Sequence, residues 1–271
     1  MFDSGWFAAL TALFAWWFST GAILWIVRQA DRKDMGKHVT IWFFPVAILG
    51  AIGAEISYDM PTVAGAYLGF ISVLMLWGWI ELAFLTGQIT GPNLYPCPDD
   101  VPQTERFIRA WGTIAYHEIC LVAVLIILIT TSAGAANTMA MSTFAVLFFA
   151  RISAKLNLYL GVPQINTEFI PRALSHLPSH FRIRSLNWLF PISVTSLSFA
   201  VSYWMVLFWQ AAPAHAAGYA ILAALTALAL LEHWLMVLAL PDAKLWRWML
   251  PEAPSTVTQK QRHRREEQHG F

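Results

Sequence analysis

Several ionisable side chains interrupt stretches of the chain that are otherwise apolar. They are carboxylates, imidazoles and two cations, namely Glu81, His117, Glu118, Arg151, Lys155, Glu232 and His233. These residue types build metal sites, pigment sites and buried ion pairs. Because an ionisable group inside a membrane helix is costly, it usually faces the interior of a helix bundle and often marks a function.

These residues share a depth. Counted from the polar end of its predicted helix, each lies about six to eight residues inside, apart from Arg151, which lies about eleven inside. At about 1.5 Å per residue most of these depths are about 9–12 Å. We therefore expect at least three of the seven to converge on one site that opens towards the cytoplasm.

A metal centre is the first interpretation of this site. Carboxylates and imidazoles on facing helices suit iron or manganese. The predicted ligands are Glu81, His117, Glu118, Glu232 and His233, together with His176 and His180 from a polar loop that also holds Glu168. Two features oppose it: adjacent residues point about 100° apart on a helix, and the di-iron Glu-x-x-His signature is absent.

Two other interpretations use the same residues. His117 and His233 could be axial ligands of a bacteriochlorophyll-type pigment. In an ion-pair network, Arg151 and Lys155 would instead neutralise the glutamates. Three acids against two cations leave one charge uncompensated, which a metal, a protonated carboxyl or a charged histidine would balance.

The composition decides the class of protein. Of 271 residues, 58% are hydrophobic and 12% are charged, whereas soluble domains carry about 25% charged residues. The net charge of +1 excludes a polybasic nucleic-acid-binding protein, and the two cysteines cannot form a disulfide framework. No nucleotide-binding motif or nucleophile elbow is present. These observations predict a polytopic membrane protein.

The apolar stretches predict an all-α integral membrane protein, a single domain over residues 1–250 with seven transmembrane helices. A spanning helix needs about 20 apolar residues, and suitable stretches cover 6–27, 39–57, 64–87, 110–133, 138–162, 187–211 and 215–240. All 17 Lys and Arg residues fall on one side of this topology. The positive-inside rule therefore predicts a periplasmic N-terminus and a cytoplasmic C-terminus. Residues 242–250 are predicted to be interfacial, and the polar tail over 251–271 to be disordered.

Four segments carry a resemblance to a known family: GWIELAFLTGQITGP, YHEIC, AKLNLYLGVPQINTEFIP and LEHWLMVLALPDAKLW. Together they resemble the photosynthetic complex assembly protein 2 (PuhE-type) family of purple phototrophic bacteria, over nearly the whole chain up to about Trp248. Members are encoded close to the gene for the H subunit of the reaction centre. The resemblance implies no catalytic residue set.

The resemblance implies an inner-membrane factor that supports bacteriochlorophyll supply and assembly of the reaction centre with its core antenna. The expected partners are subunits of these complexes or pigment-biosynthesis enzymes, together with the lipid bilayer, and no nucleic acid. The alternative class is a membrane-bound metal-dependent oxidoreductase, for example a di-iron enzyme, that acts on a tetrapyrrole or another hydrophobic substrate. Composition does not separate the two, so whether the protein is an enzyme stays open at this point.

Overall fold

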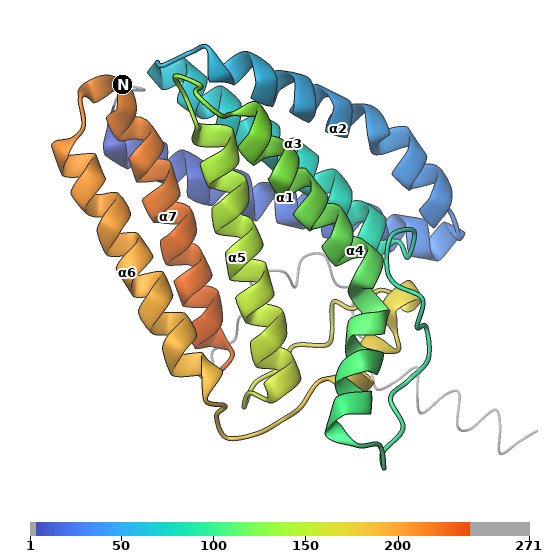
Figure 1. Cartoon of the computed structure of the whole chain (residues 1–271). Helices are drawn as coiled ribbons and strands as arrows, with labels where there is room; N and C mark the ends of the chain where they lie inside the picture. The colour runs from blue at the N-terminus through green and yellow to red at the C-terminus, as the bar shows by residue number, and fades with distance from the viewer. Residues whose placement is uncertain (1–3, 239–271) are drawn as a thin grey trace, which may run out of the picture. The chain divides into compact units, whose positions relative to one another are not determined.

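Seven long apolar helices make up the part of the chain that the structure describes, and each is long enough to cross a membrane (Figure 1). The computed structural model describes residues 4–238. The helices are α1 (Gly5–Lys33), α2 (Gly36–Tyr58), α3 (Val63–Leu85), α4 (Gln103–Thr131), α5 (Met139–Leu160), α6 (Leu189–Gln210) and α7 (Pro213–Leu235). The predicted all-α, multi-pass membrane architecture is therefore confirmed, while the predicted segments 242–250 and 251–271 lie outside the described residues.

Two helices extend further than their apolar stretches predict. Helix α1 continues to Lys33 rather than ending at residue 27, and α4 begins at Gln103 rather than at residue 110. Arg106 and Arg109, expected in a loop, therefore lie on the first turns of α4. A helix satisfies its own backbone hydrogen bonds on both sides of the membrane boundary, and long cationic side chains can reach water from it. Hydropathy alone therefore ends α1 too early and begins α4 too late.

Helix α3 is the central element of the bundle, and it packs against α1, α2, α5 and α7. Its buried side chains include Phe70, Val73 and Ile80, which join the apolar core that also contains Phe144 of α5. The approach of α2 to α3 is close because Gly50 has no side chain: a Cβ there would lie 2.6 Å from the Ser72 carbonyl oxygen. Small residues commonly allow membrane helices to pack this closely.

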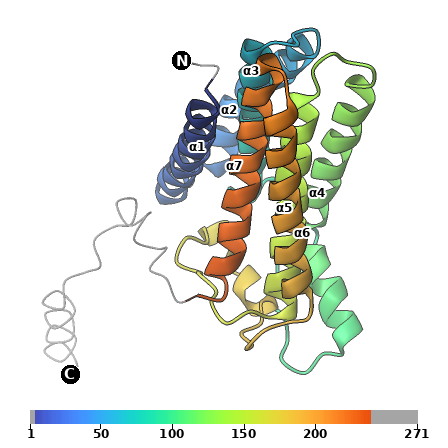
Figure 2. The ribbon, with the colours of Figure 1, turned by 90° about the vertical axis from the view of Figure 1, so that its left-hand side faces the viewer.

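Helices α2, α4 and α6 lie towards the outside. Helix α6 packs against α7, and Figure 2 shows α7, α6 and α5 running nearly parallel with α1 inclined to them. Large apolar side chains such as Phe199 and Trp209 are exposed on α6. The hydroxyls of Ser198 and Ser202 donate to the carbonyls of the preceding turn, so they leave no unsatisfied donor on this surface. Such a surface suits contact with lipid.

The segment between α5 and α6 folds over one end of the bundle. It contains two short 3₁₀ turns, η1 (Arg172–Leu174) and η2 (Leu177–His180), and one isolated parallel bridge between Val162 and Ile183. Leu174 and Leu177 are buried against Phe84 near the end of α3. This contact joins the segment to the same end of α3 that carries Glu81.

Candidate functional site

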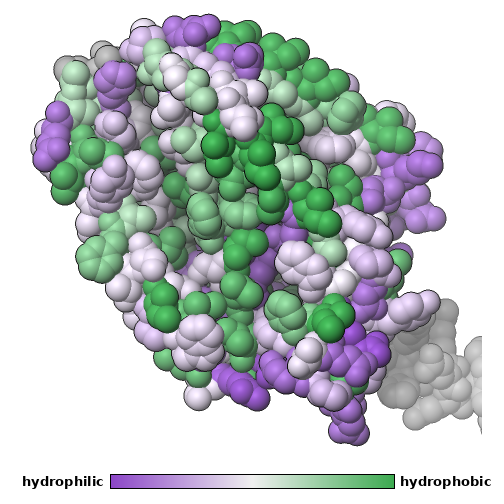
Figure 3. Space-filling view, viewed as in Figure 1, coloured by the Kyte–Doolittle hydropathy of each residue, from purple (hydrophilic) through white to green (hydrophobic). Residues whose placement is uncertain are grey.

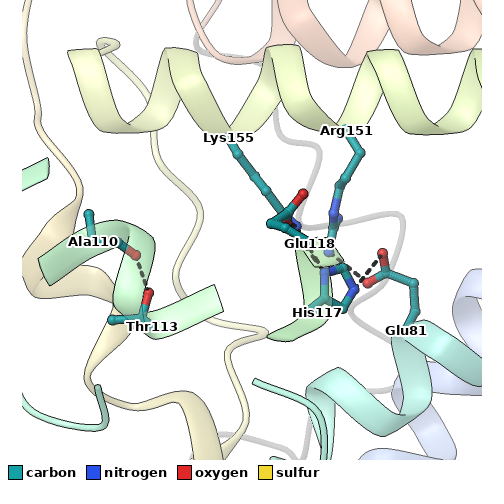
Figure 4. Close-up of polar contacts among 7 residues, drawn as sticks. All are labelled: Glu81, Ala110, Thr113, His117, Glu118, Arg151 and Lys155. Carbon is teal, nitrogen blue, oxygen red and sulfur yellow. Dashed lines mark hydrogen bonds and ion pairs between the residues drawn. The ribbon is translucent and has the colours of Figure 1, made fainter. Parts of the chain in front are cut away.

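Five of the seven predicted residues converge from three helices. Glu81 comes from α3, His117 and Glu118 from α4, and Arg151 and Lys155 from α5; Figure 4 shows both cations extending from α5 towards the α4 and α3 residues. The four-residue spacing on α5 places its two cations on one helical face. The expected convergence of at least three residues is therefore confirmed. We refer to these five residues as the charged cluster.

Each carboxylate of the charged cluster has its own cation. Nη2 of Arg151 donates to Oε2 of Glu81 at 2.6 Å, and Nζ of Lys155 donates to Oε1 of Glu118. The carboxylates are the more deeply buried partners: the side chains of Glu81 and Glu118 are 10% and 2% exposed, against 36% for Arg151 and 18% for Lys155. Two acids and two cations balance, so the charged cluster is neutral as a whole.

His117 lies between the two ion pairs and is completely buried. Its Nδ1 is 3.3 Å from Nζ of Lys155 and 3.4 Å from Oε1 of Glu118. An ammonium can only donate, so contact with Lys155 makes Nδ1 an acceptor and leaves the proton on Nε2. Nε2 faces Oε1 of Glu81 at 3.7 Å, too far for a hydrogen bond, and neither atom has another partner. The ring therefore links the two pairs electrostatically.

Phe84 forms the apolar wall of the charged cluster. Its ring centroid lies 4.4 Å from that of His117, and Nζ of Lys155 lies 5.4 Å from the ring centroid. A cation over an aromatic face is attracted by the ring quadrupole, and the ring also keeps water away from the ion pair. Phe84 stands three residues after Glu81, so one turn of α3 supplies both an acid and the wall.

The segment that follows α3 positions His117 through the backbone. The His117 N–H donates to the Thr90 carbonyl at 3.0 Å, and the Asn93 N–H donates to the Gly112 carbonyl at 3.0 Å. Gly91 makes this approach possible, because a Cβ there would lie 2.1 Å from the Gly112 oxygen. The GQITGP sequence thus has a direct structural role that the search for reactive side chains did not reveal.

Glu232 does not join the charged cluster. It lies near the end of α7, is exposed, and accepts a hydrogen bond from Nε1 of Trp16 on α1 at 3.3 Å. The imbalance of three acids against two cations that the sequence suggested therefore does not arise in the charged cluster. The single helical turn that carries Glu232 and His233 presents them to different neighbours, because consecutive side chains point about 100° apart.

His233 is buried but is held by local hydrogen bonds. Its Nδ1 lies 2.8 Å from the Ala229 carbonyl, and its Nε2 lies 2.8 Å from the Ser153 hydroxyl. The carbonyl can only accept, so Nδ1 donates and Nε2 accepts the hydroxyl proton of Ser153. Both nitrogens are thus occupied, and the ring joins α7 to α5.

His176 and His180 lie in the segment between α5 and α6, and both are buried. Burial lowers the pKa of each imidazole below its ordinary value. For His180, a hydrogen bond between Nε2 and the Tyr95 carbonyl at 3.3 Å raises the pKa in part. The nearby His176 and Arg106 lower the pKa of His180 further. Arg106 in turn donates to the His180 carbonyl at 3.2 Å. These contacts join the segment between α5 and α6 to α4 and to the segment that follows α3.

The predicted metal ligands therefore do not come together at one site. Within residues 4–238, no group of three or more His, Cys, Asp or Glu side chains is arranged to hold a metal ion. In the charged cluster, Arg151 and Lys155 already occupy the carboxylates, and their positive charges oppose the binding of a further cation. The donor set fits an ion-pair network better than an iron or manganese centre.

A second polar group, which the sequence analysis did not single out, connects α5 with α6. Asn157 is fully buried; its Nδ2 donates to Oγ of Ser193 at 2.9 Å, and its Oδ1 accepts from Asn187 at 3.0 Å. Asn187 also accepts from the N–H groups of Leu189 and Phe190, which caps the start of α6. An amide within the apolar run NLYLG was the available signal.

The fold and the charged cluster define a class: a polytopic helical membrane protein with a buried ion-pair network between three helices. Comparison of sequences gives the family. Residues 2–257 match the family described as "Protein of unknown function (DUF3623)", and the chain belongs to it. No solved structure matches the chain.

A curated relative from Rhodobacter capsulatus supports the same assignment. It is described as "Uncharacterized 30.4 kDa protein in puhA 5'region" and is 50% identical over 255 residues, which cover 92% of each chain. The family match over residues 2–257 includes all seven helices, and the relative is covered to a similar extent. The relative is therefore expected to share the fold of the present chain.

Proposed function

We propose that this protein is a non-catalytic factor of the bacterial inner membrane that supports bacteriochlorophyll supply and assembly of the reaction centre with its core antenna. The observation that carries the proposal is the relative described by its position in the puhA 5′ region, at 50% identity. This agrees with the resemblance to an assembly family encoded near the gene for the reaction-centre H subunit. Subunits of these complexes, or enzymes that make their pigment, are the proposed partners.

The proposed topology has the N-terminus in the periplasm and the C-terminus in the cytoplasm. It is supported by the position of the Lys and Arg residues outside the predicted spans, which all fall on one side of the predicted topology. In this orientation, the segments after α3 and α5 face the cytoplasm. Exposed residues of these segments, such as Tyr95 and Ile183, would then be available to cytoplasmic partners or to pigment-synthesis enzymes at the membrane surface.

The paired charges of the charged cluster support a scaffold or binding role over catalysis. Glu81 and Glu118 each have a cation, so neither is free to act as a base. The metal-dependent oxidoreductase is the second candidate. The unpartnered Glu81 Oε1 and His117 Nε2 lie 3.7 Å apart, and this pair of atoms favours it. However, Nε2 would have to lose its proton to bind a metal, and two ligand atoms beside two cations do not complete a metal site.

Deletion and complementation in a phototrophic host test the proposal. The deletion strain is expected to lose core complex, measured by its near-infrared absorption per membrane protein, and the intact gene is expected to restore it. Metal content of the purified protein separates the two candidates. Stoichiometric iron or manganese would favour the oxidoreductase, whereas an unchanged core-complex yield in the deletion strain would contradict the assembly role.

A further inference from the structure

The charged cluster is reachable from the side of the bundle. Figure 3 shows hydrophilic surface in the gap between α4 and α5, at a height where the surrounding surface is hydrophobic. The partly exposed members of the charged cluster come from α5: Arg151 is 36% and Lys155 is 18% exposed, while the carboxylates behind them are almost buried. The groups nearest to the bilayer are therefore the two cations, each paired with a carboxylate behind it.

The guanidinium of Arg151 retains hydrogen-bonding capacity. Nη2 donates to Glu81, but Nε is buried and has no partner. A guanidinium offers five N–H donors in a planar fork that matches a carboxylate. Because Nε is buried, a ligand in the gap would contact the exposed part of the Arg151 side chain instead. The shape and charge of the exposed group thus select an anionic oxygen ligand.

The depth of Arg151 distinguishes between sources of such a ligand. Arg151 lies nine residues before Leu160, the last residue of α5, which corresponds to about 13 Å along the helix. The hydrocarbon core is about 30 Å thick, so this position is near the bilayer midplane and far from the phosphates of ordinary lipids. A carboxylate at the end of a long apolar molecule can reach this depth without a bulky headgroup.

The helices beside the gap can accommodate an apolar tail. Ile119 and Val122 on α4 are exposed apolar residues, one and four positions after Glu118. Apolar contacts with such side chains fix the tail, and the cation fixes the acid group. We propose that the gap between α4 and α5 is a lateral binding site for a hydrophobic carboxylic acid whose carboxylate pairs with Arg151. This inference concerns ligand binding and does not rest on the proposed assembly role.

Photolabelling of the full-length protein in phosphatidylcholine nanodiscs tests the site. The probe is a long-chain fatty acid with a diazirine in its tail, and its methyl ester is the matched neutral probe. We expect the acid to label peptides of α4 and α5, and the ester to label them at least about tenfold less, as the loss of a charge-assisted hydrogen bond implies. Equal labelling by acid and ester would overturn the proposal without the use of any variant.

Paired variants locate the charge. The Arg151→Gln/Glu81→Gln double variant removes both partners together and so leaves no stranded charge; labelling by the acid should fall at least about tenfold. Arg151→Lys keeps a cation and should retain labelling. Glu105→Gln/Arg109→Gln removes an exposed ion pair from the same α4 helix and is the control. Unchanged labelling in the first variant would refute the role of Arg151.

The lipid of the nanodisc separates the two sources of an anionic ligand. Replacement of phosphatidylcholine by phosphatidylglycerol should leave labelling by the acid in place if the site selects a deep carboxylate. Complete competition by phosphatidylglycerol would show that a phospholipid headgroup occupies the gap, and this result would overturn the carboxylate assignment.

Discussion

Arg151 and Glu81 are 70 residues apart in the chain, yet Nη2 of the guanidinium lies 2.6 Å from Oε2 of the carboxylate. This pair joins α5 to the central helix α3, and the Lys155–Glu118 pair joins α5 to α4. Three helices that also contribute to one apolar core are thus connected through charge. The network gives the bundle a defined register, which uniform apolar surfaces in a bilayer would not provide.

Removal of one member of a buried pair should destabilise the protein. Glu118→Gln leaves the Lys155 ammonium without its partner, at an expected cost of about 3–5 kcal/mol. The double variant Glu118→Gln/Lys155→Met removes both charges and should recover much of this loss. Membrane abundance and core-complex yield are to be measured together. Normal abundance of Glu118→Gln with lost yield would show instead that Glu118 acts in a functional site.

His233→Asn tests whether His233 is a structural connection or a ligand. The imidazole spans from the Ala229 carbonyl to the Ser153 hydroxyl, and asparagine is too short to make both hydrogen bonds. The expected loss is about 1–3 kcal/mol, the cost of leaving a buried polar group unsatisfied, and it should appear as a lower unfolding temperature in detergent. A fully stable variant that lacks function would support the pigment or metal interpretation of His233.

Gly91→Ala should disrupt the contact between the segment after α3 and the backbone of α4. The added methyl group would lie 2.1 Å from the Gly112 carbonyl oxygen, so Thr90 and α4 must separate. Overpacking of this kind costs about 1–3 kcal/mol. Gly218→Ala is the matched control, because its nearest contact would be an ordinary 3.4 Å to Met139. Equal thermal stability of the two variants would refute this account of GQITGP.

The loop between α5 and α6 should lose stability at acidic pH. Burial lowers the pKa of His176 and of His180 in the folded protein, whereas their pKa in the unfolded chain is about 6.5. Below that pH the unfolded state binds more protons, so protonation favours opening of the loop. The protection of residues 172–181 from hydrogen exchange, corrected for the pH dependence of the intrinsic exchange rate, should decrease from pH 7.5 to pH 5.5. The double variant His176→Gln/His180→Gln should show a smaller pH effect, and an unchanged effect would contradict the assignment.

Reporter fusions test the proposed orientation. A cytoplasmic reporter should be active after Phe271, because the Lys and Arg residues outside the predicted spans lie on the same side as the C-terminus. A periplasmic reporter should be active when it is inserted between Ser132 and Asn137, which lie on the other side. Activity of a periplasmic reporter after Phe271 would show that the proposed orientation is wrong or that the number of spans is not seven.

The sequence by itself determined the architecture and the depth of the polar residues. Seven apolar stretches are enough to predict seven helices, since the bilayer leaves the backbone few alternatives to a helix. Depth also follows from sequence, because each residue advances along a helix by a fixed rise. For this reason the convergence of Glu81, His117, Glu118, Arg151 and Lys155 could be anticipated.

Only the tertiary structure decided which of these residues pair. Rotation of a helix about its axis and its choice of neighbours depend on packing of the whole surface, which a count along one helix does not contain. Glu232 shares the depth of the charged cluster but contacts Trp16, because α7 presents it towards α1. The contact of Thr90 with His117 is likewise invisible in the sequence, because it joins a backbone carbonyl to a backbone N–H, and every non-proline residue carries both groups.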